Sequence, residues 1–100
     1  MEFLVQIEII RPAANPQALD HLVPLETRRA EELAAAGLLR RLWRVPGRWA
    51  NWGLWQVRDS DELHAALKSL PLFPYMDVKV HPLGSHPSDP AAKNSTGGKP

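Results

Sequence analysis

The residue best suited to chemistry in this 100-residue sequence is Glu26, a carboxylate on the apolar side of a predicted helix. With successive residues about 100° apart around a helix axis, Glu26 points near the centre of an apolar stripe. The stripe is formed by Leu19, Leu22, Val23, Ala30 and Leu33. Burying an unpaired carboxylate is costly, so we expect Glu26 to pair with an arginine of the sheet, to be protonated, or to face a pocket. In a pocket, loss of water raises the pKa of a glutamate and suits it to accept and return a proton near neutral pH.

A second group of candidates surrounds Asn51, near the start of a predicted strand. Asparagine is disfavoured within strands, and an inward-facing amide could donate a hydrogen bond to a developing oxyanion. Four tryptophans fall nearby, namely Trp43, Trp49, Trp52 and Trp55. For Trp43 and Trp55 we favour packing in the core or in an interface over contact with a ligand. Asn51, Trp49 and Trp52 stay candidates for the site.

Four arginines cluster on the same predicted hairpin, namely Arg40, Arg41, Arg44 and Arg48. For Arg40 and Arg41 we favour a solvated face or a face between subunits. Arg44 or Arg48, near the end of the hairpin, could grip a substrate carboxylate with both prongs of a guanidinium. Arg44 and Arg48 are therefore candidates for substrate binding.

Other kinds of site find little support. The sequence has no cysteine, which excludes disulfide scaffolds, thiolate metal sites and cysteine nucleophiles. The four histidines show no metal-ligand spacing; they are His21, His64, His81 and His86. No phosphate-binding loop or nucleophile elbow is present. We expect no metal site, which leaves a carboxylate as the acid/base candidate.

The charge of the chain is nearly balanced. Twelve basic and 11 acidic residues give a net charge of +1, too even for a protein that binds nucleic acid or an acidic membrane. Near the N-terminus, Gln6 and Glu8 interrupt the apolar run, which fits neither a signal peptide nor a membrane span. We therefore expect a cytoplasmic protein that binds neither nucleic acid nor membrane.

The elements that must position these residues follow the order β-α-β-β-α-β. Hydrophobic periodicity and capping signals predict strands at residues 3–10, 38–45, 50–57 and 78–82, helices at 16–36 and from 59–62 to Pro71, and an ordered loop at 71–76. Pro24 lies inside the first helix and predicts a kink, or two helical segments, around residues 20–24. The order is typical of the ferredoxin-like arrangement in the α+β class, with an antiparallel sheet and both helices on one face.

The sequence predicts one domain, at residues 1–88, and a disordered tail at 89–100, because the end of the chain is rich in Gly and Pro. The predicted strands at 3–10 and 50–57 carry large apolar side chains on both faces. Helices cover only one face of such a sheet. We expect the other face to meet another subunit.

Several segments of the sequence resemble the muconolactone Δ-isomerase family. They are Leu42-Trp43-Arg44-Val45, Gly47, Ala50-Asn51, Glu62-Leu63-His64, residues 70–77 (LPLFPYMD) and His86-Pro87-Ser88. The resemblance covers about residues 1–88 and implies a ferredoxin-like fold, a homodecamer and no cofactor. It also implies an activity in the β-ketoadipate pathway of bacterial aromatic degradation, namely the conversion of muconolactone to the enol-lactone of β-ketoadipate.

The resemblance further implies three functional positions. Glu26 matches the family's glutamate and Asn51 its asparagine, whereas Trp49 stands where the family has a tyrosine. An indole N–H can donate a hydrogen bond but cannot shuttle a proton. In the implied mechanism Glu26 moves a proton from the γ to the α carbon of the lactone. Asn51, with Trp49, stabilises the carbonyl oxygen, and an arginine or His21 holds the carboxymethyl group.

Two alternatives stay open at this point. The first is a paralogue that acts on another lactone or on a natural-product intermediate, including loss of chloride as in the related chloromuconolactone dehalogenases. The second is a non-catalytic binding or assembly protein in which Glu26 forms a structural ion pair. Turnover of muconolactone tests the first alternative, and the pKa of Glu26 tests the second.

Overall fold

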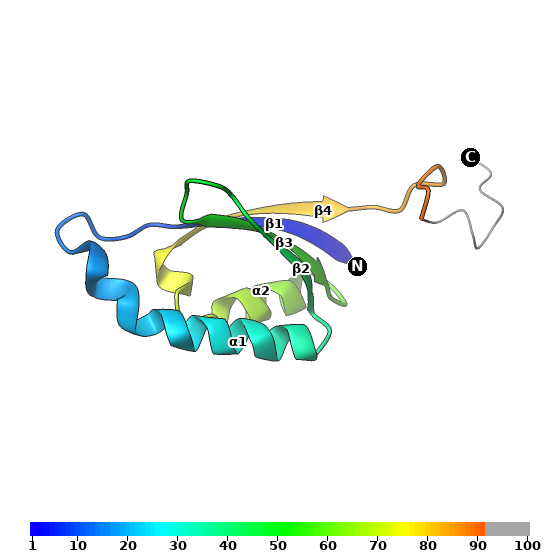
Figure 1. The fold of residues 1–100 in the computed structure, drawn as a ribbon. Coiled ribbons are helices and arrows are strands. Elements are labelled where there is room, and N and C mark those ends of the chain that lie inside the picture. Colours follow the sequence, from blue (N-terminus) through cyan, green and yellow to red (C-terminus); the bar gives the residue numbers. More distant parts are fainter. Residues whose placement is uncertain (92–100) are drawn as a thin grey trace.

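The computed structural model describes residues 1–91 and has the predicted order of elements (Figure 1). The strands are β1 (Glu2–Ile9), β2 (Leu39–Arg44), β3 (Ala50–Gln56) and β4 (Met76–Leu83). The α-helices are α1 (Val23–Ala35) and α2 (Ser60–Lys68), and the 3₁₀ segments are η1 (Pro16–Leu22) and η2 (Phe73–Tyr75). Most of the expected tail at 89–100 lies outside the described residues. Within residues 1–91, no helix is long and apolar enough to cross a membrane.

The four strands form one antiparallel sheet in the order β2-β3-β1-β4. Both α-helices lie on the same face of this sheet (Figure 1), so the ferredoxin-like α+β prediction is confirmed. Alternate residues of β1, namely Phe3, Val5 and Ile7, are buried against Leu33 of α1 and Leu63 of α2. Each such side chain stabilises the fold by about 1.5–3 kcal/mol relative to an exposed position.

The first predicted helix is divided at the proline, as expected. The 3₁₀ segment η1 ends at Leu22, and Pro24 then occupies the first turn of α1, where a missing N–H is harmless. The helix ends at Ala35, and Gly37 follows its cap residue Ala36 with a φ of 85°, a conformation that favours glycine. The N–H of Gly37 donates to Ala34 O and the N–H of Leu38 donates to Leu33 O, each at 3.0 Å. These two bonds form a Schellman motif that turns the chain from α1 into β2.

An irregularity in β2 changes which of its side chains face the helices. Leu39 pairs with Trp55, whereas Arg41 already pairs with Leu54, so the strand holds one extra residue at Arg40. Such a bulge shifts the alternation of side chains by one position. As a result Leu39 and Leu42 both project toward α1, although their spacing would place them on opposite faces of a regular strand.

The second half of the fold begins with the predicted capping sequence. The Asp59 side chain accepts a hydrogen bond from the N–H of Glu62 at 2.9 Å, and the Glu62 carboxylate accepts one from the N–H of Arg58, which anchors the start of α2. The predicted loop at 71–76 contains η2 and leads directly into β4. This strand starts at Met76, opposite Ile9 of β1, two residues earlier than expected.

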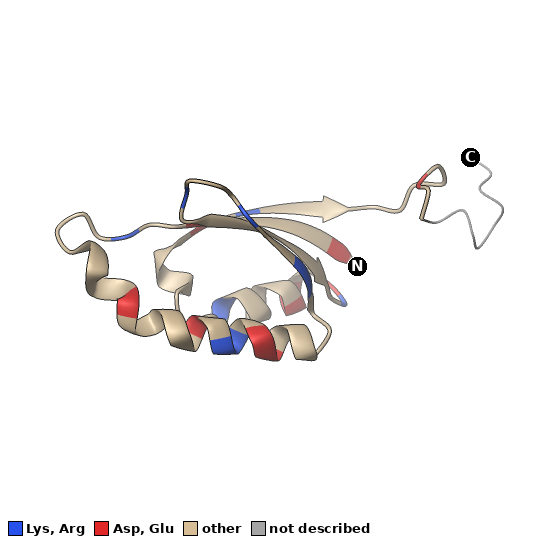
Figure 2. Ribbon diagram, viewed as in Figure 1, with Lys and Arg blue, Asp and Glu red and all other residues tan. Residues whose placement is uncertain are grey.

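The sheet face without helices carries apolar and aromatic side chains, as expected. Leu4 and Leu54 are neighbours across β1 and β3, and Trp52 stacks on His81 with ring centroids 5.7 Å apart. We call this the outer face. Figure 2 shows basic and acidic residues mixed along the helices, whereas the β2–β3 hairpin carries basic residues alone. Beyond β4 the chain continues away from the helices (Figure 1).

Candidate active site

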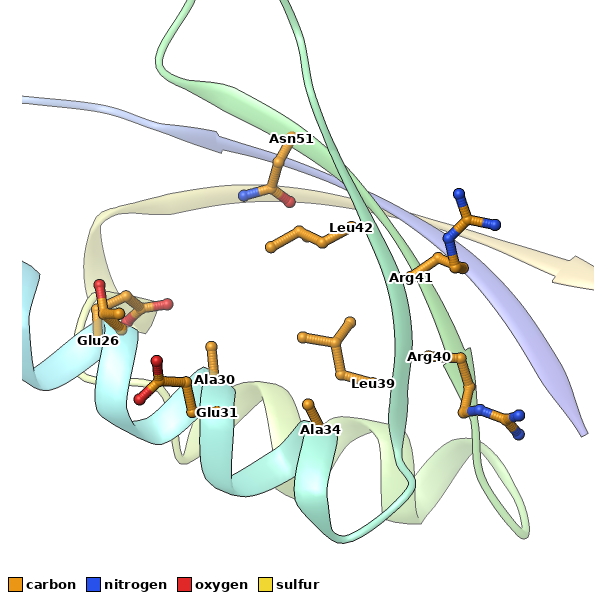
Figure 3. A pocket seen from close by; sticks show the side chains of 10 residues that line it. Glu26, Ala30, Glu31, Ala34, Leu39, Arg40, Arg41, Leu42 and Asn51 are labelled. Carbon is orange, nitrogen blue, oxygen red and sulfur yellow. The ribbon is translucent and has the colours of Figure 1, made fainter.

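A pocket of about 420 Å³ lies between α1 and the β2–β3 hairpin (Figure 3). Its lining residues are Glu26, Thr27, Ala30, Glu31, Ala34, Leu39, Arg40, Arg41, Leu42 and Asn51. We call it the α1 pocket. The small side chains of Ala30 and Ala34, one helical turn apart, keep α1 from filling the space, and the bulge in β2 supplies the two leucines of the opposite wall.

Glu26 enters this pocket from the first turn of α1. Its side chain is half-buried, and its Oε1 accepts a hydrogen bond from the N–H of Leu72 at 2.9 Å. Burial raises the pKa of Glu26, and the hydrogen bond from Leu72 opposes that rise. The start of a helix also favours a negative charge. The carboxylate is therefore held in place by its backbone partner while its desolvation makes it a stronger base.

The arginine partner considered for Glu26 is not found. Within residues 1–91, none of the ion pairs involves Glu26. The guanidinium groups of Arg40 and Arg41 point away from the α1 pocket, which they line only with their stems (Figure 3). Arg41 instead lies over the ring of Trp43, 4.8 Å from its centroid. Glu26 thus faces the pocket without a neutralising cation from this part of the chain.

Asn51 lies on the wall opposite Glu26 (Figure 3). In the antiparallel register it stands between Ile7 of β1 and Arg44 of β2, on the sheet face that carries the helices. Figure 3 shows its Nδ2 directed toward the side on which Glu26 lies and its Oδ1 toward Leu42. The structure therefore brings together two of the expected site residues, a desolvated carboxylate and an amide donor, across an apolar pocket.

A second hollow, of about 400 Å³, adjoins the first and shares Asn51 and Leu42 with it. We call it the hairpin hollow; its other lining residues are Ile9, Trp43, Arg44, Arg48, Trp49 and Ala50. Arg48 is engaged there by Glu8, with Nη2 and Oε1 2.6 Å apart, and this hydrogen bond and charge raise the pKa of Arg48. Arg44 forms no ion pair with the described residues.

Trp49 lines the hairpin hollow and is 63% exposed. The guanidinium of Arg11 stacks on its ring, 4.4 Å from the centroid. Arg11 also donates hydrogen bonds to Pro16 O and Asp20 Oδ1, each at 2.8 Å. These contacts connect η1 to the hairpin. Trp49 is not among the residues that line the α1 pocket.

Two other expected site residues lie apart from Glu26. His21 is exposed on η1 and lines neither hollow, and Trp52 projects from the outer face of β3. Ala34 and Leu39 were not expected in the site, and Ala30 was expected only as part of the apolar stripe of the helix. Two alanines one turn apart beside Glu26 are nevertheless a detectable signal for a hollow. Among residues 1–91, no cluster of His, Cys, Asp and Glu is suited to hold a metal ion.

Comparison with known proteins places this geometry in a family. The family model described as "Muconolactone delta-isomerase" matches residues 1–89. The chain belongs to the muconolactone Δ-isomerase family. Over 89 residues it is 40% identical to the muconolactone Δ-isomerase of Cupriavidus pinatubonensis, a match that covers 88% of this chain and 97% of that protein. Identity to the muconolactone Δ-isomerase of Pseudomonas aeruginosa is 38% over 89 residues, with 88% and 93% covered.

Solved structures agree with this membership in the muconolactone Δ-isomerase family. A crystal structure of muconolactone isomerase matches with a TM-score of 0.81 at 37% identity, covering 90% of this chain and 95% of that one. A dehydrochlorinase of 5-chloro-2-hydroxyhydroquinone from Burkholderia phenoliruptrix, complexed with 2,5-dihydroxybenzoquinone, matches with a TM-score of 0.67 at 15% identity, covering 86% and 96% of the chains. The latter likeness shows the fold alone. The predicted family and isomerase class are confirmed.

Proposed function

We propose that this enzyme shifts the ring double bond of an unsaturated lactone, converting muconolactone to the enol-lactone of β-ketoadipate without a cofactor. Family membership supports the substrate. The observation that carries the chemistry is the placement of Glu26, half-buried and with a raised pKa, opposite the Asn51 amide across an apolar pocket. A carboxylate base whose pKa is raised and a hydrogen-bond donor on the opposite wall are what a proton shift next to a carbonyl requires.

The proton shift takes place in two steps. The Glu26 carboxylate removes the proton from the ring carbon γ to the lactone carbonyl, and the electron pair of the broken C–H bond spreads through the ring to the carbonyl oxygen. The Asn51 N–H donates to this oxygen and stabilises its charge. Protonated Glu26 then delivers the same proton to the α carbon, so that no net proton is gained or lost and the carboxylate is restored.

The hairpin hollow supplies the cation that the α1 pocket lacks. Arg44 stands directly opposite Asn51 in the sheet register and forms no ion pair with the described residues. A carboxymethyl group on a ring bound beside Asn51 can extend into this hollow, where Arg44 would hold it with two parallel hydrogen bonds. Arg48, paired with Glu8, and Trp49 also line this hollow.

The decisive experiment measures the ultraviolet absorbance change of muconolactone with purified protein. Glu26→Gln keeps the shape of the side chain and its acceptor oxygen for Leu72 but removes the base, so we expect turnover to fall to background with the fold intact. The matched control is Glu32→Gln on the same helix, an exposed carboxylate that forms an ion pair with Arg29; this variant should keep its activity within about twofold. Full activity of Glu26→Gln would overturn the proposal.

One observation favours a neighbouring substrate as a second candidate. Trp49, at the position where the resemblance implies a tyrosine, is held by Arg11 and lines the hairpin hollow. The same assay should therefore include a chlorinated muconolactone, with chloride release as its measurement. Faster turnover of that lactone than of muconolactone would favour the second candidate, and no turnover of any lactone would favour a binding protein.

We also propose that the outer face joins copies of this chain, with the decamer implied by the resemblance as the expected assembly. Its support is the row of apolar side chains at Leu4, Trp52 and Leu54 on a sheet face that no helix covers (Figure 1).

A further inference from the structure

A small inner cavity of about 40 Å³ lies beneath the α1 pocket. Glu26, Asn51 and Leu42 are among the residues that line both spaces, so the cavity adjoins the pocket where the proposed chemistry takes place. Its walls are mostly aliphatic, and its polar members are Glu26, Asn51 and Trp55. A space of this size suits one water molecule, which needs about 10–15 Å³ and two to four polar partners.

Trp55 brings a hydrogen-bond donor to this cavity. Its side chain is 2% exposed, and its Nε1 has no hydrogen-bond partner among the described residues. The indole folds back along β3 over Gly53: a Cβ on Gly53 would lie 2.9 Å from Nε1 and 3.5 Å from Leu42 Cδ1. Glycine at this position therefore leaves the room that the indole N–H occupies.

Asn51 brings the matching acceptor. It projects from β3 on the same face as Gly53, two residues away, a separation of about 7 Å along a strand. Its Oδ1 is buried and also lacks a partner among the described residues. A donor and an acceptor that are both buried, unpartnered and separated by more than one hydrogen-bond length are the arrangement that a bridging water satisfies.

We propose that the inner cavity holds one structural water that accepts a hydrogen bond from Trp55 Nε1 and donates one to Asn51 Oδ1. Its second hydrogen is directed to the Glu26 carboxylate, which lines the same cavity. The water then has three partners, the usual number for a buried water. This proposal adds Trp55 as a positioning residue, a role that its tryptophan neighbours on the outer face and at the hairpin end do not share.

The consequence for the site concerns the direction of the Asn51 amide. With Oδ1 held by the water, Nδ2 is directed toward the side on which Glu26 lies, the direction that Figure 3 shows. An amide without this bond can rotate and present its oxygen, which would repel the developing oxyanion. The catalytic part of the inference rests on the proposed function, whereas the water site itself does not.

The water is tested directly on the wild-type protein by nuclear magnetic resonance. In a ¹⁵N-resolved NOE and ROE experiment, the indole N–H of Trp55 should show a cross-peak at the water frequency with the sign of a molecule held longer than the tumbling time. The exposed indole of Trp49 serves as the internal comparison and should show the sign of mobile surface water. Absence of a long-lived water at the Trp55 N–H, or its replacement by the ligand when the product lactone is added, would overturn the proposal.

The positioning role is tested by a double-mutant cycle on kcat. Asn51→Ala should lose on the order of 10²-fold, and Trp55→Phe roughly 10-fold because the amide is kept but no longer oriented. In the Asn51→Ala background, Trp55→Phe should cost less than about twofold, since the partner through which it acts is gone. Equal losses in both backgrounds would show that Trp55 does not act through Asn51 and would overturn its positioning role.

Two further variants separate hydrogen bonding from damage to the core. Gly53→Ala keeps the indole but places a methyl group against its N–H, and should lower kcat as Trp55→Phe does. Val57→Ala truncates a neighbouring buried core residue while keeping the N–H, and should lower the unfolding temperature without a comparable loss of kcat. If wild-type enzyme turns over no lactone, the proposed function fails, while the NMR result still decides the water site.

Discussion

The charge state of Glu26 depends on competing influences that the structure makes explicit. Burial favours the neutral acid, whereas the Leu72 N–H favours the carboxylate, and the net result is a raised pKa. The carboxylate is the active form in the proposed reaction. We therefore expect kcat/KM to fall as the pH is lowered through a pKa above the ordinary value of 4.5. A pH–rate profile measures it, and an acidic limb at or below 4.5 would contradict the burial seen here.

The same pKa has a consequence for stability. Because the folded-state pKa of Glu26 lies above the unfolded one, the folded protein loses stability as the pH rises from the unfolded pKa through the folded one. Glu26→Gln removes this loss, so we expect it to raise the unfolding temperature at pH 7 and to have no such effect below about pH 4, where both states are protonated. Thermal unfolding at the two pH values measures the difference; an equal effect at both would show that the change acts through packing.

Arg44 offers a test of how the substrate is held. Arg44→Gln removes the charge opposite Asn51 and should raise KM for muconolactone about 10-fold or more with a smaller effect on kcat, because the lost contact is to a group remote from the reacting carbons. A lactone without the carboxymethyl group is the matched control, on which wild type and variant should behave alike. Equal losses on both lactones would assign Arg44 to the fold instead.

At the residue scale, the sequence allowed prediction of side chains whose type conflicts with the local pattern. Glu26 interrupts an apolar stripe and Asn51 interrupts a strand, and both conflicts mark the pocket. Trp52 directly follows Asn51 in a strand, so its side chain faces the opposite side of the sheet, and the structure places it on the outer face, away from Glu26. Trp55 was expected to pack in the core or in an interface, and it packs in the core. That its N–H has no hydrogen-bond partner among residues 1–91 could be recognised only once its neighbours were known.

At the scale of elements, the turn at the end of α1 directs the chain into β2, the strand that supplies Leu39 and Leu42 to the wall of the α1 pocket. Gly37 has a φ of 85° and open space around it, so Gly37→Ala is opposed by the backbone conformation alone. We expect a loss of about 1 kcal/mol in the free energy of unfolding, measured with urea.

The matched control for this prediction is Gly84→Ala, after the end of β4, where there is also open space and no left-handed conformation is required. Its stability should stay within about 0.5 kcal/mol of wild type. A comparable loss in both variants would indicate that the Schellman motif does not contribute as described.

The limits of prediction at this scale are physical. Pro24 predicts the division between η1 and α1, because proline is tolerated in the first turn of an α-helix but not in its interior. The bulge at Arg40 has no comparable signal: it is defined by the pairing of β2 with β3, two residues against one. Since this bulge places Leu39 and Leu42 on one wall, the shape of the α1 pocket could not be derived from the pattern of β2 alone.

For the whole molecule, the order of strands and helices was predictable, because strand and helix periods alternate clearly along the chain, and the sheet order β2-β3-β1-β4 is the one that the ferredoxin-like arrangement requires. How copies of the chain meet could not be predicted in the same way, because an apolar outer face indicates a contact without indicating its geometry. Native mass spectrometry of the purified protein should show an assembly of several chains, and a monomer at micromolar concentration would contradict the proposed contact.

The residue to change in this test is Leu54, near the middle of the outer face. Leu54→Glu places a charge where we propose an apolar contact and should shift the protein toward smaller species. Ala65→Glu, on the exposed side of α2, is the matched control and should leave the assembly unchanged. If both variants assemble like wild type, the chains associate through another surface.

Asn51 belongs to two neighbouring hollows, and this sharing bears on how the enzyme can evolve. The proton-transfer group sits on a helix in one hollow, and the cation proposed for the distant carboxylate sits on a hairpin in the other. Substitutions in the hairpin can then alter which side groups of a lactone the enzyme accepts without disturbing the base. A duplicated gene could acquire a new substrate range through residues 43–49 alone while inheriting its reaction intact.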